Sequence, residues 1–179
     1  MTFRENITEH VTDILFIPFE NTKMLLYPGR VLNSCSFDYR AKIDKVSQEG
    51  RIKDGFPYLQ SYKGPFNFKG FAFCKVSQKK NNSNEDSFEE DYISGVLETL
   101  KSCRKIQNTS FDRVLIGYSK KYGSAYKIIK ALMSELCTSK YENQPFKKVV
   151  VTAETSFDFV ELSLGFSKNM NDFANENML

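Results

Sequence analysis

The stretch that most constrains the fold covers residues 111–154, where two short apolar runs flank an amphipathic segment. Residues 113–118 (RVLIGY) and 148–152 (KVVVT) are typical of short buried strands. Between them, Ser124 can cap a helix whose apolar residues recur at helical spacing, namely Ala125, Ile128, Ile129, Leu132, Met133 and Leu136. The stretch therefore predicts a strand, a helix and a second strand.

The connection from the first of these strands to the helix is the place to look for a nucleotide site. Residues 117–124 (GYSKKYGS) precede a helix N-terminus, where backbone N–H groups and the helix dipole favour a phosphate. The spacing differs from a Walker A loop, because five residues separate Gly117 from Gly123 and Ser124 stands where that loop has lysine. A glycine-assisted turn with exposed lysines is the main interpretation, and a small nucleotide-binding enzyme remains an alternative.

Further apolar runs predict the remainder of a sheet. Residues 12–19 and 23–27 read as a hairpin whose arms are covered on both faces. Residues 33–44 alternate, which predicts a long half-solvated strand and a sheet that is mostly antiparallel; its apolar face would carry Cys35, Phe37, Tyr39, Ala41 and Ile43. Residues 66–77 predict a kinked strand.

The helices and loops complete a single domain over residues 1–179. Apolar residues at helical spacing predict a helix over 88–105, preceded by a polar, mobile loop at 78–87. Residues 156–171 suit a helix or a strand, with the helix favoured, and both termini are expected to fray. The predicted fold is α+β, with about six mostly antiparallel strands flanked by two to three helices.

Composition excludes several classes of function. The chain holds 25 basic and 22 acidic residues, scattered without the basic stripe that a nucleic-acid backbone requires. It shows no signal-peptide core or apolar span, so we expect a cytoplasmic protein, possibly also nuclear, with no membrane partner. The four cysteines lie far apart and His10 is the single histidine. We therefore expect no metal site, no cofactor, no catalytic residue and no enzyme activity.

Aromatic residues point instead to a protein interface. There are 16 Phe and 9 Tyr residues, and aromatic side chains are enriched where proteins meet. One sheet face could be covered by a partner, or by the chain's own middle segment. If a partner covers it, the expected contact residues are Phe16, Phe19, Phe37, Tyr39 and Ile43.

The order of these elements resembles the proteasome assembly chaperone 3 family. The segments that carry the resemblance are TDILFIPFENTKMLLY, VLIGY, GSAYKIIKALMSELC, KKVVVTAE and SFDFVELSLGF. The resemblance implies a heterodimer with a related small subunit that binds proteasome α subunits, notably the fifth, and promotes α-ring assembly of the core particle. Such a chaperone acts through binding energy alone and needs no cofactor. A general heterodimeric adaptor or scaffold is the other non-enzymatic alternative.

Overall fold

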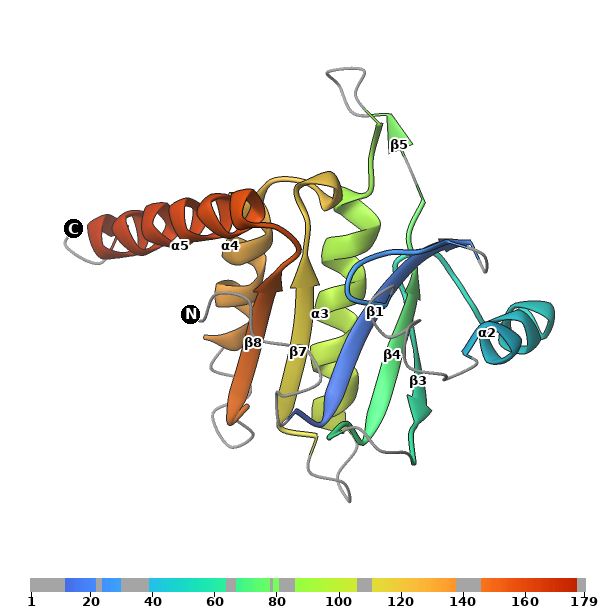
Figure 1. Ribbon diagram of the computed structural model, residues 1–179. Coiled ribbons are helices and arrows are strands. Elements are labelled where there is room, and N and C mark those ends of the chain that lie inside the picture. The colour runs from blue at the N-terminus through green and yellow to red at the C-terminus, as the bar shows by residue number, and fades with distance from the viewer. Residues whose placement is uncertain are drawn as a thin grey trace.

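A mixed β-sheet runs through the middle of the molecule (Figure 1). The computed structural model describes residues 12–21, 24–29, 39–63, 67–77, 79–80, 86–105, 111–137 and 146–176. The strands of the sheet are β1 (Ile14–Asn21), β2 (Met24–Leu25), β3 (Pro57–Ser61), β4 (Gly70–Lys75), β7 (Arg113–Tyr118) and β8 (Lys148–Ala153). The helices are α2 (Tyr39–Gln48), α3 (Glu89–Lys105), α4 (Ala125–Leu136) and α5 (Ser156–Glu176), with a 3-10 turn, η3 (Lys120–Tyr122). The six strands with flanking helices confirm the predicted fold class.

The directions of the strands differ from the prediction. The strand order is β3-β4-β1-β7-β8, with β2 paired to β1 as the start of the predicted hairpin. The pairs β1–β4, β1–β7 and β7–β8 are parallel, whereas β3–β4 and β1–β2 are antiparallel. Parallel neighbours need crossover connections, and α3 and α4 supply them before β7 and β8. The central sheet is therefore mainly parallel.

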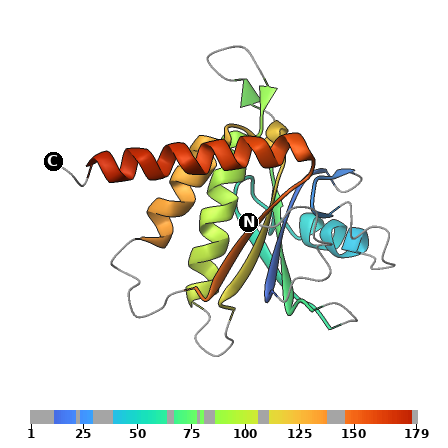
Figure 2. The same ribbon diagram turned by 60° about the vertical axis from the view of Figure 1, so that its left-hand side comes forward.

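The helices cover both faces of this sheet, as Figure 2 shows. There α3 and α4 lie on one side of the strands and α2 lies on the other, while α5 crosses near the carboxyl ends of β7 and β8. Helix α5 packs on α4 through Leu162 and Asn169, and the Asn169 side chain donates a hydrogen bond to the Tyr126 carbonyl (2.9 Å). The helix predicted for residues 156–171 is confirmed. No helix in the described ranges is long and apolar enough to span a bilayer.

Strand β1 is the centre of the core. Its residues from Ile14 to Phe19 are all buried, which explains the nearly unbroken apolar run in the sequence. Phe16 meets Tyr92 of α3 edge to face, with ring centroids 5.6 Å apart. The chain's own elements therefore cover both faces of this strand.

Helix α2 replaces part of a predicted strand. Residues 39–44 were expected to continue the alternating strand over 33–44, but they belong to α2, and residues 33–38 lie outside the described ranges. Among the side chains of α2 whose burial is described, Ile43 and Val46 are buried, and they are three positions apart. A short alternating run that also contains apolar residues at this spacing fits either element, and packing against the sheet selects the helix.

A second small pair of strands lies where a loop was predicted. Strand β5 (Lys79–Lys80) pairs antiparallel with β6 (Asp86–Ser87), and residues 81–85 between them lie outside the described ranges. Helix α3 follows directly, close to the predicted range of 88–105. Backbone pairing thus extends into the polar segment from both ends.

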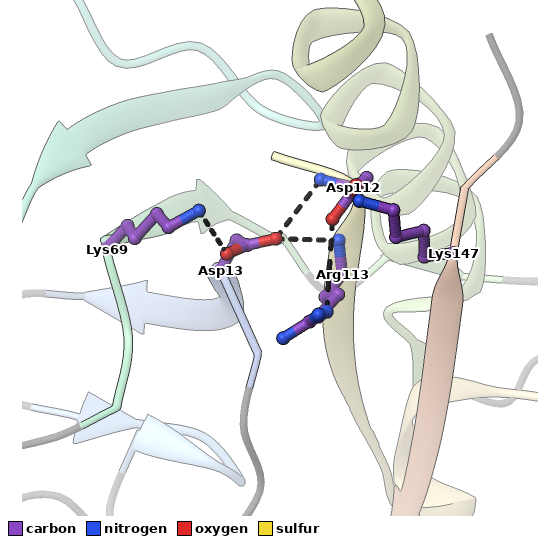
Figure 3. A network of polar contacts seen from close by, with 5 residues as sticks. All are labelled: Asp13, Lys69, Asp112, Arg113 and Lys147. Atoms are coloured by element: carbon purple, nitrogen blue, oxygen red, sulfur yellow. Dashed lines mark hydrogen bonds and ion pairs between the residues drawn. The ribbon is translucent and has the colours of Figure 1, made fainter. Parts of the chain in front are cut away.

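A polar network joins the amino ends of the strands (Figure 3). One carboxylate oxygen of Asp13 accepts hydrogen bonds from the backbone N–H groups of Asp112 (3.2 Å) and Arg113 (3.0 Å), and the other pairs with Lys69 (2.7 Å). Asp112 in turn pairs with Lys147 (2.6 Å), and this hydrogen bond holds the pKa of Asp112 below its usual range. The network ties the starts of β1, β4, β7 and β8 together at the end of the sheet opposite to the carboxyl ends.

Candidate ligand-binding crevice

The topology marks one end of the sheet as the candidate site. After β1 the chain returns to the sheet on one side as β4, and later enters on the other side as β7. In open sheets of this kind ligands bind outside the carboxyl ends of the parallel strands, where the direction of winding changes. In this chain that position lies at the carboxyl ends of β1 and β7, where the segment 26–29 contacts the loop 119–124.

Gly117 lies beneath the segment 26–29, and nothing larger than glycine fits there. A Cβ atom at this position would lie 2.5 Å from Cδ of Pro28 and 2.8 Å from two ring carbons of Tyr27. The Tyr27–Pro28 peptide bond is cis, and both residues are buried against β7. The glycine that resembled part of a phosphate loop therefore allows the segment after β2 to pack on the strand.

Tyrosine side chains fill the space beneath the crevice. The Tyr92 ring stacks on the Tyr122 ring with centroids 4.7 Å apart and 18° between the planes. The Tyr92 hydroxyl donates to the Gly117 carbonyl (2.6 Å), and the Tyr122 hydroxyl donates to the Tyr27 carbonyl (2.7 Å). Complete burial raises the pKa of Tyr92 well above its usual value. The floor is therefore closed and uncharged.

The protein's own carboxylates occupy donors of the loop that follows β7. The backbone N–H of Lys120 donates to Asp158 (2.7 Å), and that of Ser124 donates to Glu89 (2.7 Å). Gly123, with a φ of +124°, lies so close to Glu89 that a Cβ atom would approach its side chain to 2.6 Å. Two backbone donors that a phosphate oxygen could use, one at the start of η3 and one at the start of α4, are thus occupied from within the chain.

Positive charge remains on the outer side of this loop. Lys120 and Lys121 are exposed; the Lys120 ammonium lies 4.8 Å from the Phe157 ring centroid, and the Lys121 ammonium lies 5.7 Å from that of Tyr122. Lys127 is already paired with Glu89 (2.6 Å). Lys120 and Lys121 therefore bring exposed positive charge to the loop that follows β7.

The described thiols do not form a nucleophilic site. Burial raises the pKa of Cys103 to about 12 and that of Cys74 further still, so both stay protonated. Cys137 is exposed at the end of α4, while Cys35 and His10 lie outside the described residues. In the described ranges no three His, Cys, Asp or Glu side chains converge as metal ligands would.

The structure places the predicted contact residues mainly in the interior. Phe16, Phe19 and Ile43 are buried in the chain's own core, so none of them is on an exposed face. Tyr39 is the first residue of α2, and Phe37 lies outside the described ranges. The composition had favoured a protein interface as the functional site, rather than the loop at 117–124. Hydrophobic periodicity gives no signal for a site at the carboxyl ends of β1 and β7, because such a site forms only when segments distant in sequence meet.

Solved structures that share this fold include macrodomains. The Oceanobacillus iheyensis macrodomain with ADP aligns over 94% of this chain and 90% of that chain, with a TM-score of 0.67 and 9% identity. A mutant of that macrodomain with ADPR aligns over 93% and 91%, with a TM-score of 0.66 and 11% identity. The macrodomain of Mycobacterium tuberculosis DarG aligns over 86% and 97%, with a TM-score of 0.60 and 8% identity. At sequence identities this low, the structural similarity shows that the fold is shared.

Comparisons at the level of sequence find no match. The chain matches no protein-family model. It also matches no curated protein sequence.

The macrodomain fold overturns the resemblance to the proteasome assembly chaperone 3 family. With it go the implied chaperone function, the related partner subunit and the proteasome α subunits. The resemblance rested on the order of the elements and on their apolar residues, and proteins whose strands pair differently can share both. The parallel central strands of this chain distinguish it from the mostly antiparallel sheet that was predicted. The expectation that the chain is no enzyme finds no support among these neighbours, and the nucleotide-binding alternative fits them better.

Proposed function

We propose that this domain binds a ligand of the ADP-ribose class, an adenosine diphosphate with or without a second ribose, in the crevice at the carboxyl ends of β1 and β7. The observation that carries the proposal is the fold shared with the Oceanobacillus iheyensis macrodomain, whose structures are described with ADP and with ADPR. The alignment covers more than nine-tenths of both chains in the second of these structures. The strand order of this chain supports the proposal, because the direction of winding changes beside β1, where ligands bind in open sheets of this kind.

The charges around the loop define how the diphosphate would be met. Glu89 and Asp158 hold the N–H groups of Ser124 and Lys120, so those two donors are not available to a phosphate. In this proposal, the exposed side chains of Lys120 and Lys121 supply positive charge that attracts the diphosphate. Because interactions between exposed charges are screened by salt, we expect the affinity to fall steeply as ionic strength rises.

Binding is the activity that the described side chains support. A group that activates water must have a lone pair directed at the ligand. Asp158 uses its carboxylate on the Lys120 and Thr155 N–H groups and the Thr155 hydroxyl, and Glu89 uses its own on Ser124 and Lys127. Neither is directed outward as a general base.

Isothermal titration calorimetry with ADP-ribose, ADP, AMP and adenosine tests the proposal. We expect ADP-ribose and ADP to bind more tightly than adenosine, and Lys121→Glu to weaken ADP-ribose by about tenfold through charge reversal. Lys45→Glu, the same change on α2 away from the crevice, is the matched control and should leave binding unchanged. Incubation with an ADP-ribosylated peptide would reveal turnover.

Two results would contradict this function. One is the absence of heat with every nucleotide up to millimolar concentration, for a protein shown to be folded by circular dichroism. The other is equal weakening by Lys121→Glu and Lys45→Glu, which would show that the ligand responds to net charge and not to the loop.

A further inference from the structure

Glu89 is a carboxylate of one helix that serves the start of another. It is the first residue of α3, yet its carboxylate oxygens accept hydrogen bonds from the Ser124 N–H (2.7 Å) and the Lys127 ammonium (2.6 Å), at the start of α4. Figure 1 shows that α3 and α4 begin at the same end of the sheet, where the carboxyl ends of β1 and β7 lie. Glu89 therefore lies beside the proposed ligand site.

The distribution of acidic residues explains why α4 uses a carboxylate from α3. The first turn of α4 contains no acidic residue, and the Ser124 side chain makes no capping hydrogen bond. The first turn of α3 contains three acidic residues, Glu89, Glu90 and Asp91. Because a negative group is favourable at a helix N-terminus, Glu89 supplies to α4 the charge which that helix lacks. A phosphate is favoured at the same position for the same reason.

The stem of the Glu89 side chain packs on Gly123, which has a φ of +124°. A Cβ atom at position 123 would lie 2.6 Å from Cβ, Cγ and Oε2 of Glu89, so only glycine leaves room for this side chain. The Glu89 side chain is 14% exposed and its partner Lys127 is 62% exposed, so the contact lies at the surface of the protein. If Glu89 moved away, a backbone N–H, an ammonium group and the open side of a glycine would be uncovered, and together these suit an anion.

We propose that Glu89 is an internal competitor of the ligand, so that a phosphate reaches the Ser124 N–H only when the Glu89 carboxylate leaves it. This inference rests on the proposed function, because the competing group is a phosphate of the ADP-ribose-class ligand. The apparent affinity for a ligand is lowered by the fraction of molecules in which its position is free. Glu89 thereby holds the domain in a state of low affinity, and it favours ligands that bring more negative charge than the one carboxylate they displace.

Asp158, the other carboxylate bonded to this loop, has a different role. It is 4% exposed, and besides the Lys120 N–H it accepts the Thr155 N–H (3.0 Å) and the Thr155 hydroxyl (2.6 Å). These bonds fix the start of α5, so displacing Asp158 would also release that helix. Glu89, at the surface, is the carboxylate that a ligand can displace.

An NMR titration with inorganic pyrophosphate tests the competition, because this probe has a diphosphate and no nucleoside. The Ser124 amide signal of ¹⁵N-labelled protein reports on the donor directly. In Glu89→Gln we expect this signal to shift at roughly tenfold lower pyrophosphate concentration than in the unchanged protein, as follows if Glu89 occupies the donor in about nine molecules of ten. A Ser124 signal that does not respond in Glu89→Gln overturns the proposal.

Two further variants separate position from net charge. Glu89→Asp keeps the charge on a side chain that is one methylene shorter, and it should also bind pyrophosphate more tightly than the unchanged protein. Glu90→Gln removes the same charge from the same turn of α3, at an exposed position, and should leave the midpoint of the titration unchanged. Equal midpoints for Glu89→Gln and Glu90→Gln, or no gain in Glu89→Asp, overturn the proposal.

Urea unfolding distinguishes a competitor from a residue that positions the loop for the ligand. Glu89→Gln removes charge-assisted hydrogen bonds to α4, so its unfolding midpoint should fall while its affinity for pyrophosphate rises. A positioning residue would lose stability and affinity together, and that result overturns the proposal.

The competitor and the proposed function can fail separately. If Glu89→Gln improves pyrophosphate binding but neither protein binds ADP-ribose or ADP, competition with a diphosphate is supported and the nucleotide function is contradicted. If ADP-ribose binds equally to Glu89→Gln and to the unchanged protein, the function is supported and the competitor is overturned.

Discussion

Gly117 illustrates how a residue that suggests a phosphate loop can have a structural role. Its missing side chain lets Tyr27 and Pro28 lie on β7, and the Tyr122 hydroxyl then bonds the Tyr27 carbonyl. Gly123, the other glycine of the loop, allows Glu89 to reach Ser124. The two glycines therefore let distant segments pack together at the carboxyl ends of β1 and β7. The exposed positive charge there comes from Lys120 and Lys121.

Replacing Gly117 by alanine should destabilise the protein. The added methyl group would overlap Pro28 and Tyr27, and overpacking of this kind costs about 1–3 kcal/mol. Urea unfolding followed by circular dichroism measures the loss. Gly50→Ala is the control: its added methyl group would meet nothing within 4 Å, so only the positive φ is penalised. An unchanged midpoint for Gly117→Ala would show that the segment 26–29 does not pack on β7 as described.

The elements are joined at both ends of the sheet by buried carboxylates. At the amino ends Asp13 binds the start of β7, and at the carboxyl ends Asp158 joins the start of α5 to η3. Asp158 also accepts the Thr155 N–H (3.0 Å), and its own N–H donates to the Thr155 hydroxyl (3.1 Å), which is a capping box. Helix α5 is thereby tied to the loop that borders the crevice.

The amino-end network should depend on Asp13 far more than on Lys69. Asp13→Asn replaces an acceptor of two backbone N–H groups by an amide and should cost about 2 kcal/mol of unfolding free energy. Lys69→Gln removes an ion pair whose lysine side chain is 52% exposed, which should cost less than about 1 kcal/mol. Chemical denaturation of both variants separates the contributions. Equal losses would mean that the ion pair to Lys69, and not the backbone bonds to the start of β7, accounts for the contribution of Asp13.

At the scale of the whole molecule, groups kept neutral by burial make stability depend on pH. Burial raises the pKa of Cys103 from 9.0 to about 12 and that of Tyr118 from 10.0 to about 12. Both groups ionise more readily in the unfolded chain. Their contribution is therefore complete below about pH 9 and is lost as the pH rises towards 12.

The unfolding free energy should accordingly fall above about pH 9. Urea unfolding between neutral and alkaline pH measures the slope. Cys103→Val, which removes one buried ionisable group, should make the decline shallower, whereas Cys137→Ser, at an exposed position, should leave it unchanged. A flat profile, or identical slopes for the two variants, would contradict the assignment.

The sequence alone determined the identity of most elements. The apolar runs of β1, β7 and β8 and the helical spacing in α3 and α4 are local properties, and they are read from neighbouring residues. Residues 39–44 mark the limit, because a short run with Ile43 three positions before Val46 satisfies both periods. For this segment, packing in the folded protein selects the helix.

Tertiary structure alone decided strand direction and the position of the crevice. An apolar run such as that of β1 is equally buried between parallel and antiparallel neighbours, so hydrophobicity holds no record of direction. The crevice likewise depends on contacts between Tyr27 and Gly117 and between Glu89 and Ser124, which are far apart in the chain. Local patterns specify elements, whereas a site arises from pairings across the fold.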